Sequence, residues 1–79
     1  MSSTYERLVE ILTRLHDIPA DRLRPAATLG ELDIDSLTTV EISIRVERDL
    51  GVPVADDELQ PDLTLAELAD LIESRRAAV

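Results

Sequence analysis

The sequence predicts an all-α fold: a small four-helix bundle with a long loop between the first two helices and a short third helix. Apolar residues recur at intervals of three and four in three separate segments, which is the spacing of amphipathic helices. Residues that start and stop helices flank these segments, and no alternating β-branched runs are present. Leu, Ile and Val supply most of the apolar side chains and Tyr5 is the only aromatic residue, so we expect an aliphatic core.

The first helix is expected from about residue 4 to residue 16. Ser3 and Glu6 have the spacing of a capping box. A buried stripe follows at helical intervals, made of Tyr5, Leu8, Val9, Leu12 and Leu15. We interpret His16 as a C-terminal helix residue and not as a ligand.

Residues 17 to 35 are expected to form a loop, because they contain Pro19, Pro25 and Gly30 and show no sustained period. Scattered apolar residues should hold it against the bundle: Ile18, Leu23, Leu29 and Leu32. A loop of this length in a compact domain is unusual and indicates a function.

The second helix is expected from about 36 to 50, with Asp35 as its N-cap and Gly51 as its stop. A helical wheel gives it two apolar arcs. One arc holds Thr39, Ile42, Ser43, Val46 and Leu50, and the nearly opposite arc holds Leu37, Val40 and Ile44. Either the helix is central and buried on both sides, or the second arc is an exposed protein-binding patch.

A short third helix is expected from about 56 to 60, ended by Pro61, and a last helix from about 65 to 76. Thr64 and Glu67 form a second capping box before the last helix. Arg75 and Arg76 suit the negative end of its dipole.

The net charge of −9 comes from 17 acidic and 8 basic residues. This balance argues against nucleic acid or an anionic membrane as a partner and favours partners with basic surfaces. Without cysteine the chain has no disulfide and no thiol of its own. The chain has no apolar run long enough to span a bilayer and no signal peptide pattern. We therefore expect a monomeric, cytoplasmic protein of one domain, residues 1–79.

Ser36 stands at the start of the second helix without the partners that a nucleophile needs. Asp35 is a poor base and His16 lies at the far end of another helix, so we expect no enzyme activity. A calcium loop from Glu31 is rejected, because its sixth position is Ser36 instead of Gly and its twelfth is Ile42 instead of Glu. What remains is a hydroxyl presented at a helix N-terminus for modification by another protein.

The stretches "DSLTTVEI", "VERDLGVPVADDEL" and "LTLAELADLI" resemble the acyl carrier protein family in order and spacing, over nearly the whole chain. The resemblance implies that Ser36, flanked by Asp35 and Leu37, receives 4′-phosphopantetheine from coenzyme A through a phosphopantetheinyl transferase. Acyl groups are then carried as thioesters of the cofactor's thiol. It also implies a face for partner enzymes: Leu37, Val40, Glu41, Ile44 and Glu47. Those partners are ketosynthases, acyltransferases or acyl-activating enzymes with basic docking surfaces.

The chain departs from the family pattern at three positions. Asp33 replaces a frequent glycine, and Thr38 and Arg48 replace frequent acids. The changes at Thr38 and Arg48 argue against exchange with fatty acid synthase partners. The all-Arg basic set and the high Ala, Leu and Val content, which indicate a GC-rich genome, favour a discrete carrier of polyketide or other specialised metabolism over primary fatty acid synthesis. The alternatives are an aminoacyl or peptidyl carrier and a non-carrier acidic helical interaction module. The sequence offers no account of the extra carboxylate at Asp33.

Overall fold

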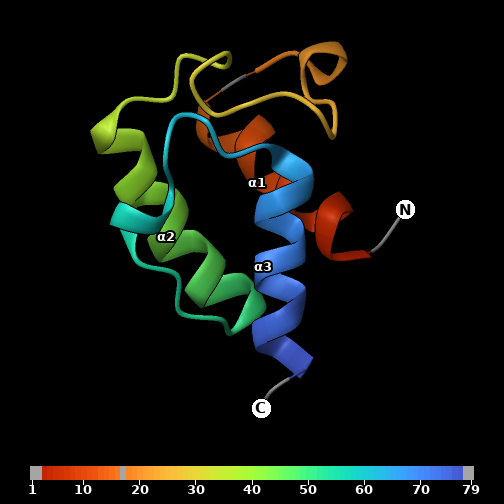
Figure 1. Cartoon of the computed structure of the whole chain (residues 1–79), viewed down its shortest axis with the longest axis vertical. Coiled ribbons are helices and arrows are strands. Elements are labelled where there is room, and N and C mark those ends of the chain that lie inside the picture. The colour runs from red at the N-terminus through yellow and green to blue at the C-terminus, as the bar shows by residue number, and fades with distance from the viewer. Residues whose placement is uncertain (1–2, 17, 78–79) are drawn as a thin grey trace.

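The computed structural model describes residues 3–16 and 18–77, and it is all-helical over this part of the chain (Figure 1). Three α-helices are present, α1 (Ser3–His16), α2 (Ser36–Leu50) and α3 (Leu65–Ala77), with two short 3₁₀ helices, η1 (Ala20–Arg22) and η2 (Asp56–Glu58). The described residues form no strand and only one isolated bridge, between Thr28 and Thr64. The long loop crosses one end of the bundle and leads into α2.

The expected four-helix count needs correction, because the predicted third helix is the single 3₁₀ turn η2. Its hydrogen bonds join Glu58 N to Ala55 O (3.0 Å) and Leu59 N to Asp56 O (3.1 Å), so each spans three residues and not four. Pro61 disfavours an α conformation at the residue before it and cannot donate a further helical bond. The segment is therefore too short to form an α-helix.

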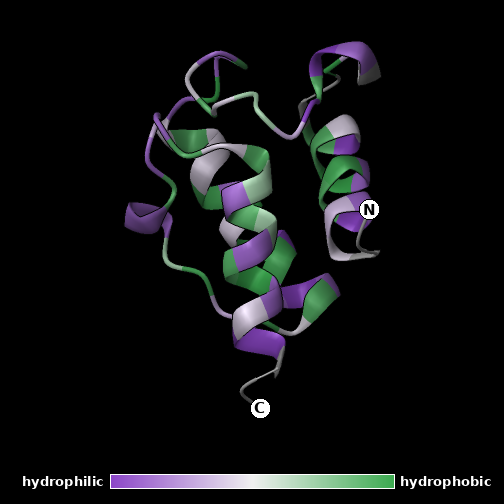
Figure 2. Ribbon diagram, turned by 45° about the vertical axis from the view of Figure 1, so that its right-hand side comes forward, coloured by the Kyte–Doolittle hydropathy of each residue, from purple (hydrophilic) through white to green (hydrophobic). Residues whose placement is uncertain are grey.

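The core is aliphatic, as expected, and each helix contributes one buried stripe. Hydrophobic and hydrophilic residues alternate along the helical ribbons in Figure 2, which is the colouring of amphipathic helices. The fully buried large side chains include Leu8 and Leu12 of α1, Ile42 and Val46 of α2, and Leu68 and Ile72 of α3. Tyr5 is also buried, and its hydroxyl donates to Leu23 O (3.2 Å), so the one aromatic residue holds the loop against α1. Burial raises the pKa of this phenol.

The helix ends are capped by residues that the sequence indicates. The Asp35 carboxylate accepts from Thr38 N at the start of α2 (2.9 Å), and Gly51 ends α2 in the left-handed conformation with φ 70. Thr64 and Glu67 form their reciprocal capping box at the start of α3. The side chains of Ser3 and His16 lie outside the described part of the chain, and with them the capping box expected at Ser3.

The long loop is fastened to the start of α3 and to the segment before it. Leu65 N donates to Ala27 O and Ala66 N to Pro25 O, both at 3.0 Å, so the loop satisfies two N–H groups that a helix start leaves unpaired. Gly30 N donates to Pro61 O (2.9 Å), and a Cβ at Gly30 would lie only 3.1 Å from that oxygen. The loop therefore acts as a cap for α3 and approaches residue 61 where only glycine fits without a shift.

No helix among the described residues is both long and apolar enough to cross a membrane.

Candidate functional site

Ser36 is the first residue of α2, and its side chain is exposed at the end of the bundle that the loop crosses. Asp35 before it is extended, with φ −88 and ψ 179. Its carboxylate caps Thr38 N, and its carbonyl accepts from Thr39 N (2.9 Å). The N-cap therefore fixes the direction in which α2 starts, and Ser36 follows at a defined position.

Two N–H groups beside the Ser36 hydroxyl remain open. A helix start leaves its first N–H groups without helical partners. The Asp35 carboxylate takes that of Thr38, and Thr39 N makes the first regular helical bond, to Asp35 O. Within the part of the chain that the structure describes, the N–H groups of Ser36 and Leu37 have no hydrogen-bond partner. These donors and the positive end of the helix dipole favour a phosphate attached to Ser36.

Residues 28–34, just before Ser36, form a hydrogen-bonded turn that the expected irregular loop did not include. Thr28 and Glu31 cap its start reciprocally, with both N–H to side-chain distances at 3.2 Å. At its end, Ile34 N donates to Leu29 O (3.2 Å) and Asp33 N to Gly30 O (3.1 Å), which is the Schellman pattern. The Thr-x-x-Glu spacing at Thr28 is the capping-box signal that could have revealed it.

Asp33 occupies the left-handed position of this Schellman turn, with φ 57, and is the one described non-glycine residue with positive φ. Glycine is the usual residue there, because a Cβ is unfavourable in this conformation. Arg22 supports the turn: its guanidinium donates to Glu31 O (2.6 Å) and lies 3.9 Å from the Asp33 carboxylate. Position 33 therefore has a backbone conformation that suits glycine, and the Asp33 carboxylate has the Arg22 guanidinium nearby.

A groove of about 250 Å³ opens beside Ser36. Its lining is mainly apolar and comes from the loop, α2 and the segment around η2: Leu29, Ile34, Thr39, Leu59 and Pro61, with Asp35, Ser36 and Asp56 at the edge. A flexible group tethered to Ser36 would have an apolar surface within reach. The groove thus fits an attached arm with a partly apolar end.

The second apolar arc of α2 is exposed, so α2 is not buried on both sides. Leu37 is 68% exposed, Val40 39% and Ile44 60%, and these are the exposed large hydrophobic residues among those described. We call these three residues the apolar patch. Glu41 and Glu47, also exposed, lie on the same helix beside it. The opposite arc is inward, since Thr39, Ile42 and Val46 are buried and the Ser43 hydroxyl donates to Val54 O.

Thr38 is buried, although the helical wheel placed it on neither apolar arc. Arg48 is exposed. Of the two departures from acidic residues, Arg48 adds an exposed positive charge, whereas Thr38 is neutral and buried.

A family model described as a phosphopantetheine attachment site matches residues 6–72, which is most of the chain. The fold and the open helix start at Ser36 thus belong to a class of small helical domains that carry a phosphopantetheine arm. The chain is also 33% identical over 67 residues to an acyl carrier protein of Thermobifida fusca (strain YX), a match that covers 84% of this chain and 85% of that protein. The chain belongs to the acyl carrier protein family.

Membership of this family means that the chain is a carrier and not a catalyst, and that its prosthetic group is a covalently attached 4′-phosphopantetheine. The residues at the start of α2 fit such a group, since a hydroxyl, two open N–H groups and an apolar groove lie together there. Once attached, the group supplies the thiol that the cysteine-free chain lacks.

Proposed function

We propose that Ser36 is the residue to which 4′-phosphopantetheine is attached. The observation that carries this proposal is the exposed Ser36 hydroxyl beside the open N–H groups of Ser36 and Leu37. In the transfer, Ser36 Oγ bonds to the phosphorus that bears the pantetheine in coenzyme A. The pyrophosphate bond breaks, the nucleotide part leaves, and the serine proton passes to a base of the phosphopantetheinyl transferase.

Each of the two residues that flank Ser36 has a separate task in this proposal. Asp35 holds the helix start through its bond to Thr38 N, and its charge is turned toward the helix donors. Leu37, 68% exposed, presents an apolar side chain to the transferase next to the reacting hydroxyl. Neither residue takes part in the chemical step.

The proposed partner face is the apolar patch with Glu41 and Glu47. Apolar contacts of Leu37, Val40 and Ile44 supply affinity, while the two carboxylates attract basic docking surfaces on ketosynthases, acyltransferases or acyl-activating enzymes. The face lies on the same helix as Ser36, so a bound enzyme sits beside the tethered thioester. In this proposal the chain is a discrete, monomeric, one-domain carrier of the cytoplasm.

The pathway that we favour is polyketide or other specialised metabolism. Arg48 places a positive charge on the exposed surface of α2 where fatty acid carriers commonly have an acid. A partner built for an all-acidic α2 would meet repulsion at this position. Comparing which acyltransferase or adenylating enzyme charges the phosphopantetheinylated chain separates this pathway from fatty acid synthesis and from aminoacyl carriers.

The attachment is tested by incubating the chain with coenzyme A and a broad-specificity phosphopantetheinyl transferase and measuring the intact mass. One phosphopantetheinyl addition is expected, and Ser36→Ala should abolish it. Ser74→Ala is the matched control, since Ser74 is an exposed serine on α3, far along the chain from the site, and this variant should load normally. An unmodified wild-type chain, under conditions that load a known carrier, would overturn the proposal.

A further inference from the structure

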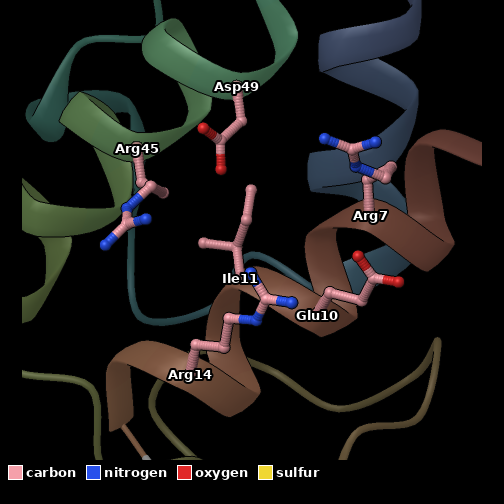
Figure 3. A pocket seen from close by; sticks show the side chains of 6 residues that line it. All are labelled: Arg7, Glu10, Ile11, Arg14, Arg45 and Asp49. Atoms are coloured by element: carbon pink, nitrogen blue, oxygen red, sulfur yellow. The ribbon is translucent and has the colours of Figure 1, made fainter.

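Three arginine side chains gather on the surface between α1 and α2, in a protein whose net charge is −9. Arg7 and Arg14 come from α1, Arg45 comes from α2, and Ile11 lies between them (Figure 3). We call these three residues the arginine cluster.

Two carboxylates share the rim with the arginine cluster, but none of the three arginines forms a close ion pair with them. The ion pairs among the described residues join Arg22 to Asp33 and Arg75 to Glu58, and no member of the arginine cluster has an ion pair or hydrogen bond. Glu10 and Asp49 lie on the same rim, at helical spacings from Arg7 and Arg45, but neither approaches an arginine within 4 Å. The three guanidinium groups outnumber the two carboxylates beside them, so this rim keeps a positive excess in a chain with 17 acidic and 8 basic residues.

The shape of the site excludes a small enclosed ligand. The hollow between the side chains has a volume of about 30 Å³, which is room for only a few water molecules. The Ile11 side chain is almost completely buried and forms an apolar floor. The anionic groups of a ligand must therefore lie across the rim of the hollow. Because the apolar floor holds little water, it weakens the screening between these groups and the arginines.

The arginine cluster also continues a surface that faces partners in the proposed function. Arg45 follows Ile44 of the apolar patch directly on α2, and from Arg45 the surface extends to Arg14 and Arg7 of α1. A protein that covers the apolar patch can therefore reach Arg45 on α2 and, across the α1–α2 interface, Arg14 and Arg7. The partner's groups that meet Glu41 and Glu47 must be basic, and its groups that meet the arginine cluster must be acidic.

We propose that the arginine cluster is a docking surface for an acidic segment of a partner protein, whose Asp or Glu carboxylates bridge the arginines of α1 and α2. It adds a positively charged contact area to a docking face on which Glu41 and Glu47 are negative. The surface is independent of the modification of Ser36, so its test stands apart from that of the attachment.

The test is a titration of the full chain, labelled with ¹⁵N at arginine, with a polyglutamate peptide at low ionic strength. The side-chain N–H signals of Arg7, Arg14 and Arg45 should shift together, although chain and peptide are both negative overall. Arg45→Gln should weaken binding about two- to five-fold, the usual effect of one exposed charge. Arg24→Gln makes the same charge change at an exposed loop residue outside the cluster and should leave binding unchanged.

Three results would overturn the proposal. No shift at millimolar peptide would show that the arginine cluster binds no acidic segment. An equal loss of affinity in Arg24→Gln would show that only the overall charge matters. Equally tight binding of inorganic phosphate, with the same shifts, would assign the surface to an isolated anion and not to an extended segment.

Discussion

Asp33 closes the turn before Ser36 in the left-handed conformation, with φ 57. Because this conformation is unfavourable for residues with a Cβ, Asp33→Gly should raise the free energy of unfolding by about 1 kcal/mol. The gain should persist although the exposed Arg22 pair is lost, since such pairs contribute little. Urea unfolding measures the difference. Asp33→Ala keeps the unfavourable conformation and should be no more stable than wild type, and an Asp33→Gly variant less stable than wild type would contradict this account.

Asp35 acts at the same scale through its side-chain cap on Thr38 N. Asp35→Ala should lower the free energy of unfolding by about 1 kcal/mol, the typical value of an N-cap. Asp35→Asn keeps an oxygen acceptor and should remain close to wild type in the same urea experiment. Equal losses in both variants would show that the carboxylate charge matters and not the cap.

The residues that bound α2 and the turn before it differ in how far the sequence alone could predict them. Asp35 and Gly51 are the commonest cap residues in the expected places, so local chemistry suffices for both. Asp33 could not be explained, because its left-handed φ depends on the turn from Thr28 to Ile34, which has no apolar period to reveal it. Its partner Arg22 lies on another part of the loop, and sequence spacing says nothing about that contact.

At the scale of elements, the proposed partner face lies on α2. Glu41→Lys with Glu47→Lys should slow association with a partner enzyme about tenfold at low ionic strength and flatten its salt dependence, because exposed charges steer encounter. Asp62→Lys with Asp70→Lys makes the same charge change at exposed residues outside α2 and should have a much smaller effect. Stopped-flow association rates measure both. Equal slowing in the two variants would mean that net charge, not the α2 face, is recognised.

The 3₁₀ turn η2 depends on α3 for its position. Arg75 of α3 donates to the Glu58 carboxylate (3.2 Å for Nη1 to Oε1) and to Pro53 O (2.9 Å). The Arg75 hydrogen bond holds the pKa of Glu58 below its ordinary value of 4.5. Since the folded-state pKa is lowered, the stabilisation is complete above about pH 4.5 and is lost as the pH falls through the folded-state pKa.

Arg75→Gln should therefore bring the pKa of Glu58 back toward 4.5 and destabilise the protein at pH 7 more than at pH 3. Side-chain NMR titration of Glu58 and urea unfolding at the two pH values measure these effects. Arg24→Gln, at an exposed loop residue, controls for the loss of one positive charge. An unchanged Glu58 pKa in Arg75→Gln would contradict the assigned cause.

Periodicity and cap residues were sufficient to predict the α-helices, but they were not sufficient to predict the two 3₁₀ helices. The expected second helix, about 36 to 50, is observed as Ser36–Leu50, because both of its ends have strong local signals. The expected third helix is a 3₁₀ turn, and the 3₁₀ helix η1 was not anticipated. Three-residue elements show no period, and distant contacts such as that of Arg75 with Glu58 hold η2.

For the whole molecule, the loop explains how one small chain holds its site. Its carbonyls at Pro25 and Ala27 cap α3, and its backbone at Leu29 and Gly30 bonds to the segment before α3. The same loop ends in the turn that leads into Ser36. The sequence indicated the loop and its functional importance, but the pairing of the loop with the start of α3 comes from contacts far apart along the chain.

The charge of the whole molecule is also less uniform than its net value of −9 suggests. Acidic residues flank the apolar patch, while the arginine cluster lies between α1 and α2. Composition predicted attraction to basic partners, and it could not predict the arginine cluster, because only the packing of α1 on α2 brings Arg7, Arg14 and Arg45 together.

The central claim is that this carrier bears its arm on Ser36, and fragment mass spectrometry of the loaded protein tests it most directly. After incubation with coenzyme A and a phosphopantetheinyl transferase, the account predicts one phosphopantetheinyl group, located on Ser36 within the sequence "DIDSLTTVEI". A group located on any other residue, or full loading of the Ser36→Ala variant, would contradict it.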